Sequence, residues 1–190
     1  MEAKKIIITG GATRIGSAIA KSLVSFETKI GIHFNKSKSS ALKLKKELEE
    51  LGAEAYLFKA DLNNLKQTET LIKKAYKTLK GLDCLINNAS IFENDNLENF
   101  SEKSFTKHMN INLKAPAIIT QNFKRLIKNK EGCIINIIDQ RVEKLTPFFF
   151  SYTLSKSSLA VFTKTSAMKL APNIRAVSYT HLTLPTSFLV

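Results

Sequence analysis

The sequence predicts a doubly wound α/β domain built on a parallel sheet. Two observations support this prediction. Apolar runs alternate with helical patterns five times along the chain, and the apolar runs are continuous, without alternating polar residues. Continuous apolar strands are typical of a parallel sheet that is buried on both faces, and the intervening helices form the covering layers. A chain of 190 residues is long enough for one such domain.

Each element follows from a local pattern. Strands are expected where short apolar runs end at Gly or at polar residues, and helices where apolar residues recur three or four positions apart. Gly52 and Gly81 follow two helical patterns and are expected to end them. The expected strands are residues 4–10, 29–34, 53–61, 82–90, 132–139 and 173–177, and the expected helices are residues 14–26, 39–52, 64–81, 101–128 and 149–170.

A glycine-rich turn, ITGGATRIG, joins the first strand to the first helix. Gly10 permits a tight turn, and Gly16 lets the helix approach the strand. The helix N-terminus then offers free N–H groups and a partial positive charge to a pyrophosphate. Arg14 stands where a third glycine is common, followed by Ile15, and its guanidinium is expected to reach a phosphate. The turn therefore predicts a Rossmann-type dinucleotide site.

The end of the second strand distinguishes the two nicotinamide cofactors. NAD sites usually place an acid there, but no Asp or Glu occurs between Thr28 and Lys46. We expect Lys36, Ser37 and nearby backbone to hold a 2′-phosphate, which predicts NADPH; an ordinary polar loop is the alternative. Asp61 is expected to hydrogen-bond the adenine. The other candidate cofactor-binding residues at strand ends are His33, Phe34, Asn35, Leu62, Asn88, Ala89 and Ser90.

Several motifs occur together in one order and spacing: TGGATRIG, the Asp61–Leu62 pair, NNAS, Asn112 in NINLKAP, and Tyr152 with Lys156. With these motifs the chain resembles the short-chain dehydrogenase/reductases over residues 3 to 175. Most of that family carries Ser where this chain has Asp139. With RIG and NNAS, this Asp is similar to the pteridine reductase branch, which includes bacterial dihydromonapterin and dihydrofolate reductases. The resemblance implies an NADPH-dependent oxidoreductase that forms a homodimer or homotetramer.

The candidate catalytic residues are Asp139, Tyr152, Lys156 and Asn112. Tyr152 and Lys156 are four apart and share a helix face, so the ammonium is expected to lower the pKa of the phenol. Tyr152 would then donate a proton opposite the hydride. Tyr152 and Lys156 are also candidate cofactor-binding residues, and Lys156 is expected to hold the nicotinamide ribose. The resemblance implies that Asn112 positions Lys156 through a water.

Asp139 is the informative departure, because an ionised carboxylate accepts hydrogen bonds and cannot donate them. This suits the reduction of a pterin C=N bond, in which a ring nitrogen gains a proton, better than the reduction of a ketone. Two alternatives stay open. One is a short-chain reductase of a ketone or acyl-thioester, and the other is a non-catalytic nucleotide- or nucleic-acid-binding protein.

The composition of the chain argues against several other classes of function. The net charge is +13, but only four of the 29 basic residues are Arg, which indicates a solvated lysine-rich surface and not a nucleic-acid site. The three histidines have no Cys or His at ligand spacing, so no metal is expected. Cys84 and Cys133 are expected to be buried thiols in a reducing cytosol. There is no membrane-spanning run and no secretory signal at the start, so we expect a cytoplasmic protein that binds small molecules.

The last fifteen residues, AVSYTHLTLPTSFLV, resemble a sequencing adapter translated in frame. We therefore expect residues 1–175 to form an incomplete short-chain reductase domain and residues 176–190 to be a non-native tail. Residues 177–190 are expected to make few core contacts. The 190-residue chain is expected to be inactive and prone to aggregation.

Overall fold

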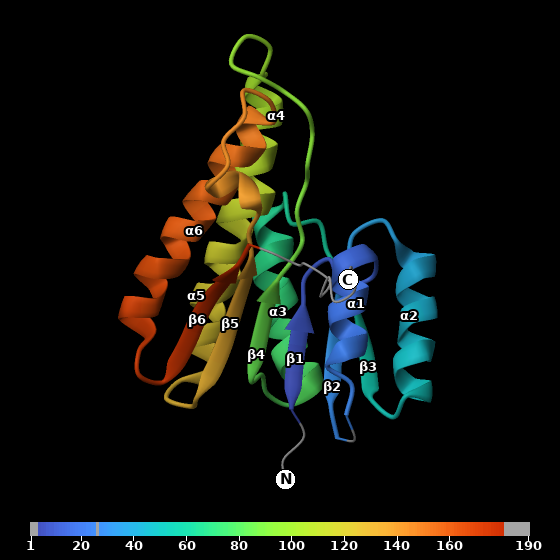
Figure 1. Cartoon of the computed structure of the whole chain (residues 1–190). Coiled ribbons are helices and arrows are strands. Elements are labelled where there is room, and N and C mark those ends of the chain that lie inside the picture. The colour runs from blue at the N-terminus through green and yellow to red at the C-terminus, as the bar shows by residue number, and fades with distance from the viewer. Residues whose placement is uncertain (1–3, 26, 181–190) are drawn as a thin grey trace, which may run out of the picture.

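A computed structural model describes residues 4–25 and 27–180 of the chain (Figure 1). Six strands form one sheet in the order β3-β2-β1-β4-β5-β6, and every neighbouring pair is parallel. This confirms the doubly wound α/β fold. The strands are β1 (Lys5–Ile8), β2 (Lys29–Phe34), β3 (Glu54–Lys59), β4 (Cys84–Asn87), β5 (Gly132–Ile137) and β6 (Ile174–Tyr179).

Helices cover both faces of the sheet. The first two helices pack on one face, and α3, α5 and α6 pack on the other. The helices are α1 (Arg14–Ser22), α2 (Lys38–Glu50), α3 (Leu65–Leu79), α4 (Glu102–Met109), α5 (Ala115–Ile127) and α6 (Phe150–Leu170), with a π-helix η1 (Asn110–Lys114) and a short 3₁₀ turn η2 (Gln140–Val142).

The strands are apolar throughout because both of their faces are buried. Ile7 and Leu85 pack against α3 and α5, while Ile8 and Ile86, one position further along their strands, pack on the side of α1 and α2. Successive side chains of a strand point to opposite faces. A strand between two helix layers therefore needs apolar residues at consecutive positions, as the sequence shows.

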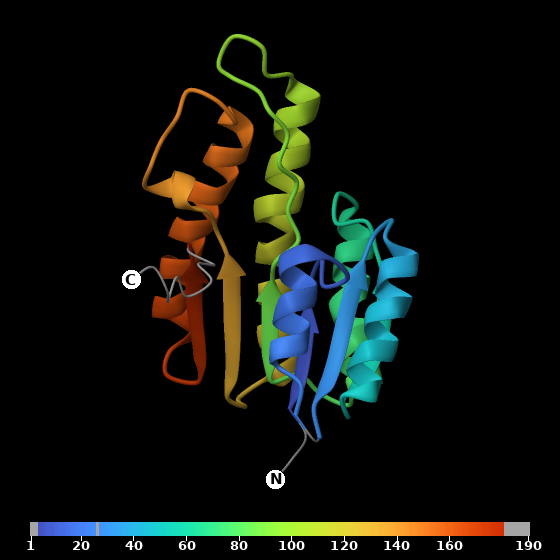
Figure 2. The same cartoon turned by 45° about the vertical axis from the view of Figure 1, so that its right-hand side comes forward.

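The helix expected over residues 101–128 is one continuous path in three parts, α4, η1 and α5. The π-helical segment carries Asn112, which is fully buried. Short π-helical segments within α-helices often occur at functional sites. Figure 2 shows α4 and the loop before it rising beyond the carboxyl ends of the strands, where the candidate site lies.

Strand β6 extends beyond its expected end at residue 177. It continues to Tyr179 and pairs with β5 over six positions, from Gly132↔Ile174 to Ile137↔Tyr179. Residues 177–179 thus pair with β5 through their backbone, but none of them belongs to the buried core, so the prediction of few core contacts is not contradicted there. Residues 181–190, including His181, lie outside the described residues.

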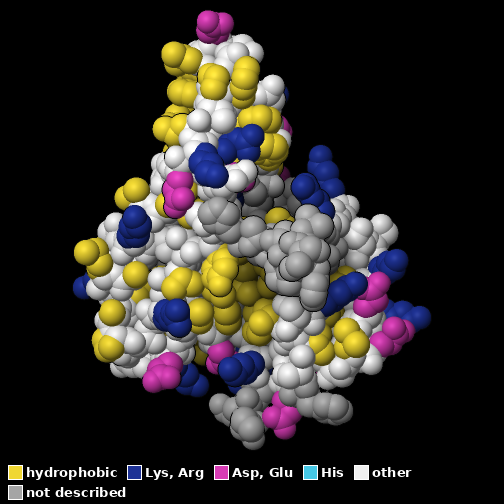
Figure 3. Space-filling model, in the orientation of Figure 1, with side chains coloured by type: hydrophobic (Ala, Val, Ile, Leu, Met, Phe, Trp, Pro, Cys, Tyr) yellow, Lys and Arg dark blue, Asp and Glu magenta, His cyan; other side chains and the backbone are white. Residues whose placement is uncertain are grey.

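One face of the sheet is only partly covered. Within the described chain, α1 and α2 lie over β1, β2 and β3, and no helix lies over this face at β5 and β6. Figure 3 shows hydrophobic side chains gathered at the centre of this face. Across residues 4–25 and 27–180, none of the helices is both long and apolar enough to span a membrane.

Candidate active site

The glycine turn brings three backbone segments into contact. Gly10 has φ +60, and a Cβ there would lie 2.9 Å from the Cα of Ala89. A Cβ on Gly16 would lie 2.2 Å from the carbonyl oxygen of Gly10, so no side chain fits. Arg14 also has a positive φ, of 50, although it carries a side chain and such strain costs roughly 1–3 kcal/mol. Arg14 and Ile15 are exposed at the start of α1, where a phosphate could be bound.

The His33 side chain forms a hydrogen bond with this turn and so helps to hold it in place. Its Nδ1 accepts a hydrogen bond from the Gly10 N–H at 3.0 Å, and its Nε2 donates to the Ala60 carbonyl at 3.1 Å. Burial lowers the pKa of His33 to about 4, so the ring is neutral at physiological pH. Both ring nitrogens have partners and the residue is buried. The His33 side chain therefore holds the glycine turn in place, and the expected role of His33 in cofactor binding stays a prediction.

The end of β2 is open where a 2′-phosphate is expected. Asn35, Lys36 and Ser37 are exposed between β2 and α2, whereas the side chain of Phe34 is buried in the core. Ser37 occupies the N-cap position of α2, so the free N–H groups of that helix point toward the same loop.

The end of β3 presents one carboxylate. The Asp61 Oδ1 accepts a hydrogen bond from the Asn63 N–H at 2.9 Å, which fixes the turn before α3. Asp61 itself is half-buried, and Leu62 beside it lies in the core. Only Asp61 of this pair can therefore offer a polar side chain to a ligand.

The NNAS segment after β4 is tied directly to the glycine turn. Asn88 Nδ2 donates to the carbonyl oxygens of Thr9 and Gly10, both at 3.0 Å. The Thr9 hydroxyl accepts from the N–H groups of Asn88 and Ala89, also at 3.0 Å. The two loops thus hold each other in place, and Ser90 is left exposed at the end.

Tyr152 and Asp139 are in direct contact. The Tyr152 hydroxyl donates to Asp139 Oδ2 at 3.0 Å, and Asp139 Oδ1 accepts from the Arg141 N–H at 2.9 Å. Burial and the negative charge of Asp139 raise the pKa of Tyr152 above its usual value. The prediction that Lys156 lowers this pKa is wrong. The positive charge that opposes the rise is that of Arg141.

Lys156 is buried beneath the tyrosine. Its Nζ lies 5.8 Å from the centre of the Tyr152 ring and donates to the Ile137 carbonyl at 2.7 Å. Burial lowers the pKa of Lys156 to about 8, although the Asp139 charge opposes this. Lys156 is thus a buried cation one helical turn from Tyr152, anchored to the end of β5.

Asn112 ties the loop after β4 to α6. Its Nδ2 donates to the Ile91 carbonyl at 3.1 Å and to the Ser155 hydroxyl at 3.0 Å, and its Oδ1 accepts from the Ile91 N–H at 2.9 Å and the Ser90 hydroxyl at 3.2 Å. Ser155 directly precedes Lys156 on α6. In these contacts Asn112 positions the helix that bears Lys156; the water-mediated role implied by the resemblance stays a prediction.

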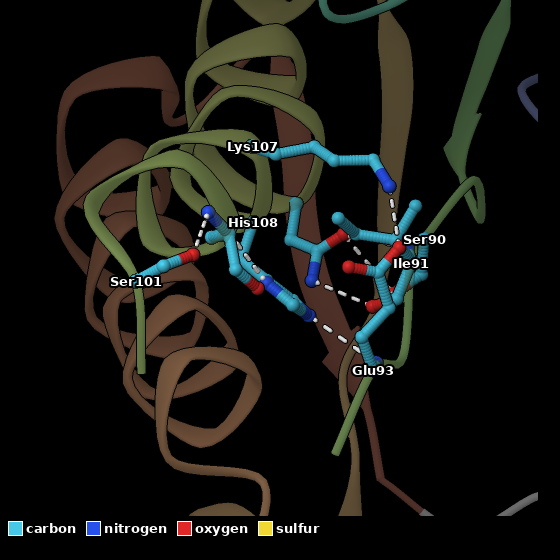
Figure 4. A network of polar contacts seen from close by, with 8 residues as sticks. Ser90, Ile91, Glu93, Ser101, Lys107 and His108 are labelled. Atoms are coloured by element: carbon cyan, nitrogen blue, oxygen red, sulfur yellow. Dashed lines mark hydrogen bonds and ion pairs between the residues drawn. The ribbon is translucent and has the colours of Figure 1, made fainter. Parts of the chain in front are cut away.

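A polar network continues outward from Asn112 (Figure 4). His108 Nε2 accepts from the Glu93 N–H at 3.3 Å, and its Nδ1 donates to the Ser104 carbonyl at 2.9 Å. Lys107 forms an ion pair with the Glu93 carboxylate. These contacts hold the segment after β4 against α4, so the loop that borders Tyr152 has a defined path.

The sequence matches the short chain dehydrogenase family over residues 4–184. The chain belongs to this family. Among curated relatives, nodulation protein G of Rhizobium sp. (strain N33) is 30% identical over 169 residues, which cover 88% of this chain and 67% of the relative. The 3-oxoacyl-[acyl-carrier-protein] reductase of Synechocystis sp. is 28% identical over 172 residues, which cover 90% of this chain and 70% of the relative. The chain therefore spans about two thirds of the length of these relatives.

Solved structures of short-chain dehydrogenases share the fold closely. FolM alternative dihydrofolate reductase 1 from Brucella suis, in complex with NADP, is 37% identical with a TM-score of 0.87, covering 95% of this chain and 76% of that one. A blue fluorescent protein from a metagenomic library, in complex with NADPH, is 30% identical with a TM-score of 0.88, covering 94% of this chain and 74% of that one.

In this short-chain dehydrogenase an aromatic cluster borders Tyr152, and sequence reasoning missed it. The rings of Phe92 and Phe149 stack with centroids 4.2 Å apart, and Phe92 meets the Tyr152 ring edge-on at 4.7 Å. The Arg141 guanidinium lies 4.7 Å from the Phe149 ring centre and 5.3 Å from that of Phe92. The position of Phe92, two residues after NNAS, was the only available signal.

Asp95 was also missed, and it caps α6, the helix that carries the candidate catalytic residues Tyr152 and Lys156. Its Oδ1 accepts from the Ser151 N–H at 3.0 Å, and its carbonyl oxygen accepts from the Phe150 N–H at 3.2 Å. The two segments are 56 positions apart in sequence, so no local pattern reveals the cap. Asp95 thereby fixes the start of α6 next to Tyr152.

Proposed function

We propose that the protein is an NADPH-dependent oxidoreductase that reduces a C=N bond of a pterin, in a dihydropteridine or dihydrofolate-like substrate. The observation that carries this proposal is the hydrogen bond from the Tyr152 hydroxyl to Asp139. A carboxylate at this position accepts hydrogen bonds, which suits a substrate rich in ring N–H and amino groups. The chain spans only part of its relatives' length, so the activity belongs to the full-length gene product.

The residues present fit a nicotinamide dinucleotide. At the N-terminus of α1, Gly10, Gly16 and Ala89 approach so closely that the turn has room for backbone atoms but not for side chains. Such a turn suits a bound pyrophosphate. The exposed Lys36 and Ser37, in a loop without acids, favour the 2′-phosphate of NADPH. When bound, this cofactor supplies the hydride. Two FolM structures, 36% and 37% identical to this chain, are complexes with NADP.

The raised pKa of Tyr152 defines its part in the reaction. Because burial and Asp139 disfavour the phenolate, the Tyr152 hydroxyl keeps its proton at neutral pH. It can therefore donate a proton to a ring nitrogen once the hydroxyl turns away from Asp139, to which it donates at 3.0 Å in this structure. Lys156, held against the Ile137 carbonyl, places a positive charge beside this pair.

The aromatic cluster supports a flat substrate. Phe92 is half exposed, at 51%, and its edge contact with Tyr152 places an apolar ring next to the proton donor. Stacking between aromatic rings is worth roughly 0.5–1.5 kcal/mol beyond the burial of area. A pterin ring could use this surface, whereas a flexible acyl chain gains little from it.

The second candidate is a short-chain reductase of a carbonyl substrate. It is favoured by the 28% identity to a 3-oxoacyl-[acyl-carrier-protein] reductase. The two candidates differ at Asp139, because a carboxylate repels the developing alkoxide of a ketone reduction.

The full-length gene product should be assayed with NADPH and NADH against a dihydropterin, dihydrofolate, a simple ketone and a 3-oxoacyl thioester. We expect turnover of a dihydropterin or dihydrofolate with NADPH. Lys36→Glu should weaken NADPH binding far more than NADH binding. Turnover of the ketone or thioester alone would establish the second candidate, and equal use of NADH would overturn the reading of the β2 loop.

A further inference from the structure

The two cysteines lie at the end of the sheet opposite the candidate active site. Cys84 begins β4, and Cys133 is the second residue of β5. They are register partners on these neighbouring strands. Both thiols are free, and both side chains are half-buried, where the sequence led us to expect buried thiols. Neither belongs to the reductase machinery described above.

The register places the two thiols side by side. Register partners on parallel strands point to the same face, and neighbouring strands lie ~4.8 Å apart. Disulfides join Cα atoms ~4.4–6.8 Å apart, so the backbone spacing already fits a bridge. Cys84 and Cys133 each shift the pKa of the other, as neighbouring thiols do. The pairing of their strands therefore suits a bond between the two sulfurs.

A third residue in the same row makes the two thiols unequal. Arg175 on β6 is the register partner of Cys133. The neighbouring Cys84 and the positive charge of Arg175 lower the pKa of Cys133, although its burial opposes this. Cys84 has no such cation in its row; its hydrogen bond to Cys133, its burial and the charge of Asp83 raise its pKa, and Lys4 opposes this. The positive charge of Arg175 therefore favours the thiolate of Cys133 over that of Cys84.

The row faces the partly covered side of the sheet. Cys84 packs at the margin of the core on the side of α1 and α2, together with Ile135, the next residue of β5 on that face. This is the side on which no described helix lies over β5 and β6 (Figure 1). Cys133 is itself only half-buried, so its side chain is not enclosed in the core.

We propose that Cys84 and Cys133 form a redox-active dithiol that a hydroperoxide converts to a disulfide. The Cys133 thiolate attacks the peroxide, and the O–O bond breaks to give a sulfenic acid and, after protonation, water or an alcohol. The Cys84 sulfur then attacks the sulfenic sulfur, the S–S bond forms, and the hydroxyl leaves as a second water with the Cys84 proton. Two sulfurs are oxidised by one electron each, and the peroxide takes up both electrons. This site is independent of the proposed reductase function.

The test counts the free thiols of the chain, which come from Cys84 and Cys133 because the chain has no other cysteines. The 190-residue chain is treated with hydrogen peroxide at low protein concentration, denatured, alkylated with N-ethylmaleimide and weighed by mass spectrometry. We expect two adducts before oxidation and none after it, with a mass lower by two hydrogen atoms and full recovery with dithiothreitol. Bridged dimers on a non-reducing gel, or sulfinic acid without a bridge, would overturn the proposal.

The order of the steps is tested by the unequal reactivity of the thiols. Without any substitution, limited alkylation at pH 7 should label Cys133 about tenfold faster than Cys84. Cys84→Ser should accumulate a sulfenic acid on Cys133 that dimedone traps, whereas Cys133→Ser should leave Cys84 reduced. Equal labelling of the two wild-type thiols, or equal oxidation of the two variants, would contradict the assigned roles.

Arg175 offers a matched set of variants. Arg175→Gln should slow alkylation of Cys133 and its oxidation, and Arg175→Lys should largely retain both rates. Arg125→Gln, which removes a positive charge from α5 and leaves the cysteine row intact, serves as the control. If Arg125→Gln slowed the reaction as much as Arg175→Gln, a general charge effect would replace the proposed contact.

Discussion

The two halves of the sheet build their parts of the site in different ways. At the glycine turn, the contacts join backbone atoms of residues 9–16 to the neighbouring loop, and steric exclusion fixes the arrangement. Around Tyr152, the contacts join side chains from two segments that are far apart in sequence: Phe92 follows β4, and Asp139 and Phe149 lie between β5 and α6. Residues close together in the sequence determine the backbone geometry of the glycine turn. The charges around Tyr152 depend instead on which loops converge there.

Among the residues of the half of the site that contains Asp139 and Tyr152, we expect the largest loss of turnover from a substitution of Tyr152. In the full-length gene product, Tyr152→Phe should reduce turnover ~10²–10⁴-fold, because the proton donor is lost. NADPH affinity should change little, since the glycine turn is untouched. Tyr56→Phe is the matched control, because the Tyr56 hydroxyl also donates to a carboxylate, that of Glu54 at 2.6 Å, away from the site. Steady-state kinetics and cofactor titration measure both effects, and substantial turnover by Tyr152→Phe would exclude the phenol as the donor.

In the half of the sheet that bears the glycine turn, His33 should make the stability of the fold depend on pH. Its folded pKa of about 4 lies below the ordinary value of 6.5, so the unfolded chain binds a proton that the folded chain does not. As the pH falls from 6.5 toward 4, this difference should remove ~3 kcal/mol of stability. Urea unfolding at pH 7 and pH 4.5 measures the loss, and His33→Gln should show less of it. The same loss in the variant would mean that other groups carry the acid sensitivity.

The fold could be predicted from the sequence because its signals are local. Continuous apolar runs marked all six strands, and Gly10 and Gly16 marked the turn, since only glycine fits those backbone contacts. The observed strands end a few residues away from the expected positions where polar residues follow the paired part of the strand. Beyond residue 175 the chain still pairs with β5 through Tyr179, because backbone hydrogen bonds form a strand whatever the origin of its side chains.

The site could be predicted only in part. Tyr152 and Lys156 were found from their spacing, but spacing alone did not show that burial and Asp139 would outweigh the cation. His33 stood at the expected strand end, yet its ring is turned toward the Gly10 N–H. Phe149 and Asp95 lie in segments without any local motif, so only the three-dimensional convergence of the loops reveals them.

A smaller effect is expected at Asp95, which caps the start of α6. Asp95→Ala should lower the free energy of unfolding by ~1 kcal/mol and also reduce turnover, because the start of α6 positions Tyr152. Asp95→Asn should retain most of both, since the amide oxygen can still accept from the Ser151 N–H. Asn64→Ala removes a comparable cap on α3, where Asn64 Oδ1 accepts from the Gln67 N–H at 3.1 Å, and should lower stability alone. Equal loss of turnover in both alanine variants would show that the effect is not specific to α6.

The measurement that tests the central claim most directly is the substrate preference of Asp139→Ser. The serine hydroxyl can still accept from the Arg141 N–H, so the local turn should persist. In the full-length gene product we predict that kcat/KM for a dihydropterin falls ~10²-fold or more while NADPH affinity stays near normal. The kcat/KM for a simple ketone should hold or rise, because the repelling carboxylate is gone. Unchanged dihydropterin turnover in Asp139→Ser would contradict the account.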